Sequence, residues 1–214
     1  MKFLSNVTFS AENADSAGNV IKALKSLLVK MGVDATFTAP VDAFSTAETV
    51  TIFTDGGAKA SADNLGGWAC IIEKADGTVI EQSGGVVNTT NNRMEMLAVI
   101  KALEQVEMGA PIVVVADSEY VIKGCTAWAR NWKRNGWRTF AGEPVKNKDL
   151  WETLLALYSL HNIKFQHVKG HTGHPQNERC DQLCTEAMAA VNKAMLAGQP
   201  FEIDPFGPNP NVTA

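Results

Sequence analysis

The sequence has little cysteine, no long apolar run and little excess charge, and each shortage excludes a class of protein. Four cysteines in 214 residues, without a CxxC pair, are too few for a disulfide-rich secreted scaffold. Cys180 and Cys184 lie one helical turn apart, and we interpret them as semi-buried thiols rather than metal ligands. No apolar run approaches the roughly 20 residues that span a bilayer, and the N-terminus lacks the apolar centre of a secretion signal. We therefore expect a cytoplasmic protein that is not bound to membranes.

The net charge of −4 argues weakly against a nucleic-acid partner, but the charge is unevenly distributed. Residues 130–148 contain six basic residues and one acid, Glu143. A local basic patch attracts a polyanion more strongly than the net charge of the chain suggests. The six basic residues are Arg130, Lys133, Arg134, Arg138, Lys146 and Lys148.

The chain divides into an extension over residues 1–48, a main domain over residues 49–196 and a tail over residues 197–214. The tail holds four of the eight prolines, which predicts irregular structure. The extension has strand-like alternation and then amphipathic helical spacing at Asn19–Met31, which predicts a small strand-helix-strand unit. Such a unit buries too little surface to be stable alone, so we expect it to pack on the main domain, a partner or a second copy. Monomer and homodimer both stay open.

The main domain changes from strand to helix periodicity along its length. Its first half predicts antiparallel strands, with Asp76-Gly77 as a hairpin turn between the second and third. Helical spacing follows, and Asn91 or Asn92 can cap that helix. The order of elements predicts an α/β fold with a mixed sheet covered by helices. We expect strands at residues 48–54, 68–74, 78–87, 112–116 and 163–168, and helices at 94–103, 118–128, 148–160 and 177–196.

Four acids of the main domain stand at the ends of predicted elements. Asp55 follows the first strand, and Asp117 follows the buried strand Ile112–Ala116. Glu95 and Asp181 fall in the first turns of two helices. Each acid alone has an ordinary structural explanation: a helix cap for Asp117, a turn acid for Asp55, and a favourable place on a helix dipole for the other two.

Together the four acids indicate a metal site. If the strands that carry Asp55 and Asp117 are neighbours, both carboxylates converge at one end of the sheet. Several close carboxylates repel one another unless cations lie between them. Oxygen ligands with room for water suit Mg²⁺. Two such ions about 4 Å apart can bind a scissile phosphate, activate the attacking water and stabilise the leaving oxygen.

The sequence around these acids resembles the type 1 ribonuclease H family. The resemblance extends over about 140 of the 214 residues. Several matching segments in the same order over this length are not expected by chance, whereas one short motif could be. The segments that carry it are Ile52–Gly56 (IFTDG), Thr89–Glu95 (TTNNRME), Asp117–Val121 (DSEYV), Val168–His174 (VKGHTGH) and Pro175–Asp181 (PQNERCD).

The resemblance implies a ribonuclease H-like fold: a five-stranded mixed sheet, antiparallel and then parallel, flanked by helices. It implies an endonuclease that hydrolyses the RNA strand of RNA–DNA hybrids with two Mg²⁺ ions, or Mn²⁺, and leaves 3′-hydroxyl and 5′-phosphate ends. By the same resemblance, Asp55, Glu95, Asp117 and Asp181 match the metal-binding carboxylates, and His171 the mobile histidine near the leaving group. His171 lies between Gly170 and Gly173, and a histidine titrates near neutral pH, as a proton shuttle must. We expect His174 to be structural.

The resemblance also implies substrate contacts in three places. Asn91 and Asn92 can reach the minor groove, where 2′-hydroxyls are displayed. The backbone at Gly56 and Gly57 can approach the RNA strand closely. The basic segment, in which tryptophans alternate with cations, resembles the protrusion that grips the DNA strand. The alternative for this segment is a solvated helix whose tryptophans pack in the core. We expect Trp128 to be partly buried in this way, and Trp137 to be less buried. The further contacts expected are Glu119, Trp132, Lys133, Arg134, Trp137, Arg138, Thr139, Lys146 and Asn177.

Three features depart from the family pattern: Glu119 replaces a frequent Gln, Gly57 a common Ser, and the loop at residues 59–65 lacks the usual glycine-proline run. They touch substrate contacts and leave the carboxylates unchanged. Two alternatives remain: a nuclease of the same fold that cuts DNA, and a catalytically silent hybrid-binding protein. The extension contains four Lys against five acids and no Trp or Tyr, which argues against a hybrid-binding module there.

Overall fold

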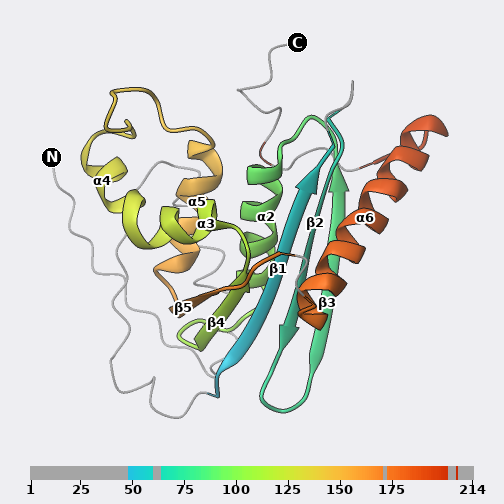
Figure 1. Ribbon diagram of the computed structural model, residues 1–214, viewed down its shortest axis with the longest axis horizontal. Helices are drawn as coiled ribbons and strands as arrows, with labels where there is room; N and C mark the ends of the chain where they lie inside the picture. The colour runs from blue at the N-terminus through green and yellow to red at the C-terminus, as the bar shows by residue number, and fades with distance from the viewer. Residues whose placement is uncertain (1–47, 60–63, 171–172, 202–205, 207–214) are drawn as a thin grey trace, which may run out of the picture. The chain divides into compact units, whose positions relative to one another are not determined.

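The computed structural model describes residues 48–59, 64–170, 173–201 and 206, which form a mixed sheet flanked by helices (Figure 1). The strand order is β3-β2-β1-β4-β5. The first three strands pair antiparallel, and β1, β4 and β5 run parallel. This confirms the predicted five-stranded sheet. The strands are β1 (Val50–Ala58), β2 (Gly66–Glu73), β3 (Val79–Val86), β4 (Pro111–Ala116) and β5 (Asn162–His167).

The predicted hairpin turn joins β2 to β3. The Lys74 amide donates to the Thr78 carbonyl at 2.9 Å, and the Thr78 amide donates to the Asp76 carboxylate at 2.8 Å. Gly77 has φ 85°, a left-handed conformation that glycine adopts without a Cβ penalty. The turn therefore fixes the register in which β2 and β3 pair.

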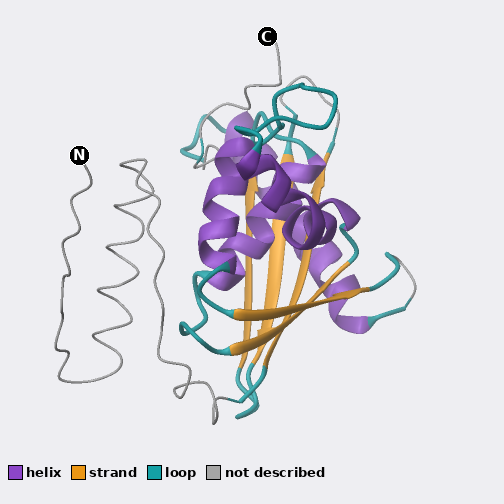
Figure 2. Ribbon diagram, turned by 90° about the vertical axis from the view of Figure 1, so that its left-hand side faces the viewer, coloured by secondary structure: helices purple, strands orange, loops and turns teal. Residues whose placement is uncertain are grey.

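Helices cover both faces of the sheet, which Figure 2 shows from the side. On one face α6 packs against β1, β2 and β3 around a small core that includes Phe53, Ile71 and Cys184. The opposite face carries the larger core, to which α2 and α5 contribute, with Trp151 fully buried. The helical segments are α2 (Asn91–Leu103), α3 (Glu119–Lys123), η2 (Gly124–Trp128), α4 (Ala129–Arg134), α5 (Lys148–Tyr158) and α6 (Pro175–Leu196).

Several predicted boundaries were wrong. Strand β1 continues through Asp55 to Ala58, because its antiparallel ladder with β2 runs on after the parallel ladder with β4 has ended. Thr90, not Asn91 or Asn92, is the N-cap of α2, so Glu95 lies in the second turn rather than the first. Helix α6 begins at Pro175, two residues earlier than predicted, as suits a proline at the first helical position.

The predicted helix after Asp117 is longer than expected and changes geometry midway. Ser118 caps α3, and its hydroxyl accepts from the Val121 amide at 3.4 Å. The helix then widens into the π turn η2 and continues as α4. A Cβ at Gly124 would lie 1.9 Å from the Trp151 ring, so only glycine lets the buried tryptophan pack against this turn. The segment therefore reaches from Asp117 to the basic residues that follow.

The predicted extension, residues 1–48, lies outside the described residues apart from Glu48, and its strand-helix-strand unit stays a prediction. The same holds for most of the tail. Within the described ranges, no helix combines the length and apolar character needed to cross a membrane.

Candidate functional site

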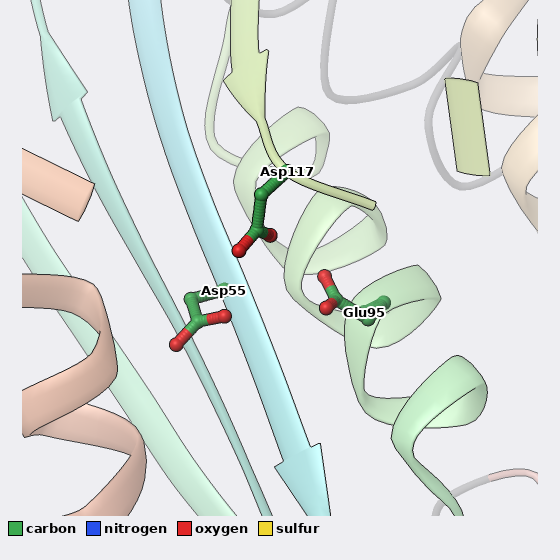
Figure 3. A group of neighbouring side chains, drawn as sticks. All are labelled: Asp55, Glu95 and Asp117. Atoms are coloured by element: carbon green, nitrogen blue, oxygen red, sulfur yellow. The ribbon is translucent and has the colours of Figure 1, made fainter. Parts of the chain in front are cut away.

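The end of β4 brings two predicted acids together. Strands β1 and β4 are parallel neighbours whose ladder ends at the pair Phe53 and Val115. Asp117 follows the last residue of β4, while Asp55 lies on the part of β1 that runs past it. Glu95 reaches the same place from α2 (Figure 3). One oxygen of each carboxylate lies within 4.8 Å of the others. The predicted convergence is thus present for three of the four acids.

Helix α2 reaches this position because β1 carries a glycine there. A Cβ at Gly56 would lie 2.3 Å from the Glu95 amide nitrogen and 2.3 Å from the Met94 carbonyl carbon. No side chain fits in that space, so the helix backbone rests on the strand next to Asp55. The missing side chain of Gly56 thus makes room for α2, and the predicted approach of its backbone to the RNA strand stays a prediction. Gly57 is more open: among the described residues, a Cβ there would meet only the Met188 methyl within 4 Å.

Two of the three carboxylates, those of Glu95 and Asp117, are poorly compensated among the described residues. Burial raises the pKa of Glu95 well above its ordinary value, and the negative charges of Asp55 and Asp117 raise it further. Within the part of the chain that the structure describes, Glu95 Oε2 and Asp117 Oδ1 are buried and have no hydrogen-bond partner. Buried acceptors of this kind are costly unless something donates to them or coordinates them. The cluster therefore has the donor set, the burial and the unmet charge of a cation site.

Gly170 is part of the surroundings of Asp117, a role that we did not predict. A Cβ at Gly170 would lie 2.6 Å from Asp117 Oδ2, so the loop after β5 passes directly over that carboxylate. His171 is the next residue but lies outside the described residues, so its predicted role stays a prediction. His174 is the N-cap of α6, and its ring lies 5.4 Å from that of Phe53, a packing role as expected.

Asp181 lies on α6, in the second turn of the helix, and is half-buried. It is not among the three acids whose oxygens lie within 4.8 Å of one another. Its negative charge nevertheless raises the pKa of the Cys184 thiol, as the charges of Asp55 and Glu95 also do. Asp181 therefore borders the cluster from the face of the sheet opposite to α2.

The two cysteines of α6 are more buried than predicted. We expected Cys180 and Cys184 to be semi-buried, but both are fully buried.

The two asparagines predicted to contact substrate are exposed at the start of α2. Asn91 Oδ1 accepts from the Ala58 amide at 2.6 Å, which ties α2 to the end of β1. Asn177 differs from expectation, because it is buried at 4% exposure and its side chain faces the protein interior. Glu119 is exposed, as a surface contact requires, and pairs with Lys123 one turn on at 2.5 Å.

The basic segment combines a packed aromatic base with exposed cations. The Trp132 ring packs against Trp128 and the buried Trp151, at centroid distances of 5.6 and 5.3 Å. The expected order of burial was wrong: Trp128 is 36% exposed, whereas Trp137 packs against the core. Trp128 is carried by the π turn, which turns it toward solvent, and Lys148 Nζ lies 5.8 Å from the centre of the Trp137 ring.

Beyond α4 the segment forms a small hairpin. Thr139 is half-buried, and its amide donates to the Glu143 carbonyl at 2.8 Å. Arg138 Nη1 donates to the Gly142 carbonyl at 2.7 Å. Phe140 is fully exposed at the tip. The exposed cations of this region are Arg130, Lys133, Arg134, Arg138, Lys146 and Lys148.

Tyr120 connects the basic segment to the acids, and sequence reasoning missed it. Its hydroxyl accepts from Trp151 Nε1 at 3.0 Å and from Asn147 Nδ2 at 3.3 Å, and it donates to the Lys146 carbonyl at 3.4 Å. Because Tyr120 lies three residues after Asp117, this network joins α3 to the C-terminal end of the basic segment and to α5. The only sequence signal was the position of a tyrosine directly after the Asp-Ser-Glu run.

Comparison with known proteins decides the family. The RNase H family model matches residues 47–189, two thirds of the chain. The chain belongs to the RNase H family. It is therefore an enzyme of the ribonuclease H class, as the resemblance implied. The ribonuclease H of Pseudomonas savastanoi pv. phaseolicola is 46% identical over 144 residues, which cover 67% of this chain and 95% of that protein. That of Dinoroseobacter shibae is 48% identical over 141 residues, 64% and 89% of the two chains.

Solved structures agree on the fold. The crystal structure of LC9-RNase H1, described as a type 1 RNase H with the type 2 active-site motif, superposes with a TM-score of 0.59 at 24% identity. The match covers 80% of this chain and 90% of that one. At this identity the superposition supports the RNase H fold, while the family membership rests on the sequence matches above.

Proposed function

We propose that this enzyme hydrolyses the RNA strand of RNA–DNA hybrids as an endonuclease. The observation that carries the proposal is the cluster of Asp55, Glu95 and Asp117, whose oxygens lie within 4.8 Å of one another in a member of the RNase H family. Two of these carboxylates present buried oxygens without a hydrogen-bond partner among the described residues. A cluster maintained in this form is poorly suited to a silent binding protein, since it destabilises the fold unless a cation binds there.

The donor set fits magnesium. Carboxylate oxygens with space for water are the ligands that Mg²⁺ takes, and Mn²⁺ accepts the same set. We propose that Asp55, Glu95 and Asp117 hold the first ion and that Asp181 with Asp55 holds a second. When bound, such ions supply charge for the scissile phosphate, an activated water and a stabilised leaving oxygen, which yields 3′-hydroxyl and 5′-phosphate ends.

The protein's own residues prepare this chemistry. Gly56 sets α2 against β1, and so holds the Glu95 carboxylate beside Asp55. Gly170 itself lies against Asp117, and we propose that His171, the next residue, moves a proton at the leaving 3′ oxygen or helps the product leave. Asp55 lies on β1 and Asp117 directly follows the neighbouring strand β4, so the sheet fixes their separation before substrate arrives.

Substrate binding is assigned to two surfaces. Asn91 and Asn92, with the backbone at Gly57, face the minor groove of the hybrid, where the 2′-hydroxyl distinguishes RNA from DNA. The basic segment binds the DNA strand, with its cations on phosphates and the aromatic side chains of Trp132 and Trp137 against the sugars. Glu119 lies between these surfaces along the chain. Such contacts make affinity fall with rising salt.

A cleavage assay tests the substrate. The wild-type protein is incubated in Mg²⁺ with one end-labelled sequence as RNA–DNA hybrid, duplex RNA and duplex DNA. Cleavage of the RNA strand of the hybrid alone, with 5′-phosphate product ends, supports the proposal. Cleavage of duplex DNA would favour the DNA-cutting alternative, and binding of the hybrid without cleavage under Mg²⁺ or Mn²⁺ would favour the silent binder.

The assembly and location of the enzyme are further proposals. The four cysteines are free thiols, which suits the reducing cytoplasm where we place the protein. We propose a monomer or a homodimer held by residues 1–48. Size-exclusion chromatography of the protein with and without these residues distinguishes the two, because only the dimer loses mass by half or more on their removal.

A further inference from the structure

Two buried thiols of α6 contact the strand that carries Asp55. The Cys180 thiol lies 3.6 Å from the Phe53 carbonyl oxygen, and the Cys184 thiol donates to the Asp55 carbonyl oxygen at 3.3 Å. Four residues along a helix advance by about 6 Å, and two residues along a strand by nearly the same length. Because these two lengths match, both cysteines contact β1 at once and α6 runs along the strand in a fixed register. The contact of Cys184 is with the backbone of Asp55 itself.

Glycines set how closely α6 approaches the sheet at this point. A Cβ at Gly67 would lie 2.3 Å from the Cys184 carbonyl oxygen, and one at Gly85 would lie 2.4 Å from the Ala187 carbonyl oxygen. The helix backbone therefore rests directly on β2 and β3. At its first turns, Arg179 forms a bidentate ion pair with Glu81 of β3 at 2.8 and 3.1 Å. Cys184 thus contacts two strands: its carbonyl oxygen lies against Gly67 of β2, and its thiol against the Asp55 carbonyl of β1.

Cys184 also lies among the acids of the site. Its sulfur lies 3.3 Å from the carbonyl oxygen of Asp55, one of the three clustered acids. Asp181 is three residues before Cys184 on the same helix, so the two side chains point to one side of α6.

We propose that Cys184 is a positioning residue: its contact with the Asp55 carbonyl fixes the spacing between α6 and β1 and so holds Asp181 beside the cluster of Asp55, Glu95 and Asp117. The inference rests on the proposed function only in treating Asp181 as a ligand of the second ion. Cys184 itself touches no substrate and takes no part in proton transfer.

A double-mutant cycle on Mg²⁺ binding tests the coupling. Mg²⁺ affinity is measured by calorimetry, without nucleic acid, for the wild type, Cys184→Ala, Asp181→Asn and the double variant. Cys184→Ala weakens Mg²⁺ binding by about threefold to tenfold, at the lower end of what outer contacts of a metal site contribute. The same substitution changes nothing in the Asp181→Asn background, because it acts through that carboxylate. Unchanged affinity in Cys184→Ala, or an equal loss in both backgrounds, would overturn the proposal.

Two variants separate positioning from packing. Cys184→Ser keeps a donor for the Asp55 carbonyl and should restore wild-type Mg²⁺ affinity. Cys70→Ala removes a fully buried thiol from the opposite face of the sheet and should lower thermal stability without changing Mg²⁺ affinity. Failure of serine to restore the affinity would also contradict the proposal. Hybrid cleavage by the wild type, measured alongside, tests the proposed function independently of the cycle.

Discussion

Neutralising Glu95 should make the metal-free enzyme more stable while abolishing its activity. Glu95 is half-buried beside Asp55 and Asp117, with its Oε2 atom fully buried, and burial together with the charges of both aspartates raises its pKa. Its ionised form therefore destabilises the fold whenever no cation is bound. Glu95→Gln keeps the shape of the side chain and removes the charge. If Glu95 served only to pack the fold, the same substitution would lower the stability of the protein instead of raising it.

The expected gain can be estimated from the buried charge that the substitution removes. Leaving a buried polar group without a partner costs about 1–3 kcal/mol, and more when the group is charged. The amide of glutamine still has to be accommodated, but it carries no charge for Asp55 and Asp117 to repel, so we expect a net gain of about 1–3 kcal/mol. For a chain of this size each kcal/mol raises Tm by about 2–4 °C, so the variant should melt about 2–10 °C higher in EDTA. Because the pKa of Glu95 is raised in the folded state, the penalty is present at pH above that pKa. It disappears as the pH falls toward the ordinary value of 4.5, and the gain of the variant should shrink in parallel.

Differential scanning calorimetry in EDTA at pH 8 and pH 5 measures this effect. The matched control is Glu107→Gln, which removes an exposed carboxylate and should leave Tm within about 1 °C. Added Mg²⁺ should raise the Tm of the wild type and of the control, and raise that of Glu95→Gln much less. A variant that melts lower than wild type in EDTA at pH 8 would refute the view that the cluster is maintained against its own repulsion.

Other predictions concern the loop and the substrate surface. Gly170→Ala places a methyl group 2.6 Å from an Asp117 oxygen, so hybrid cleavage should fall at least tenfold while Tm stays within about 2 °C, as kinetics and calorimetry will show. Glu119→Gln releases Lys123 from its ion pair and removes a charge that repels phosphate, so hybrid Kd should fall by about twofold to fivefold in low-salt filter binding. Lys133→Ala should reduce the slope of log affinity against log salt by about 1, measured by the same titration.

Much of the fold was predictable because the sequence signals are local. The alternation of β3, the Asp76-Gly77 turn and the continuous apolar run of β4 each specify an element without distant contacts. The continuation of β1 through Gly56 was not predictable in this way. Its pairing partner is β2, and a Gly-Gly sequence by itself indicates a turn. The cap of α2 was also missed, since Thr90 and the two asparagines after it are all plausible capping residues.

The site was predictable where residue type and strand order suffice. Asp55 and Asp117 converge because the parallel ladder of β1 and β4 ends just before both residues. Helix α2, packed against β1, adds Glu95 to them. What could not be predicted are contacts between distant segments, such as that of the Cys184 thiol with the Asp55 carbonyl, 129 residues away. Trp128, the exposed tryptophan, lies in a π turn for which the sequence offers only the glycine at its start, Gly124.

The most direct test of the account compares wild type with Asp117→Asn on a labelled RNA–DNA hybrid in Mg²⁺, with cleavage and binding measured on the same samples. Substrate contacts and carboxylates lie on different residues, so the variant should bind the hybrid within about threefold of wild type. Its cleavage rate should fall by at least 10³-fold, since a ligand of the proposed metal site is lost. Cleavage by Asp117→Asn near the wild-type rate would contradict the assignment of the site.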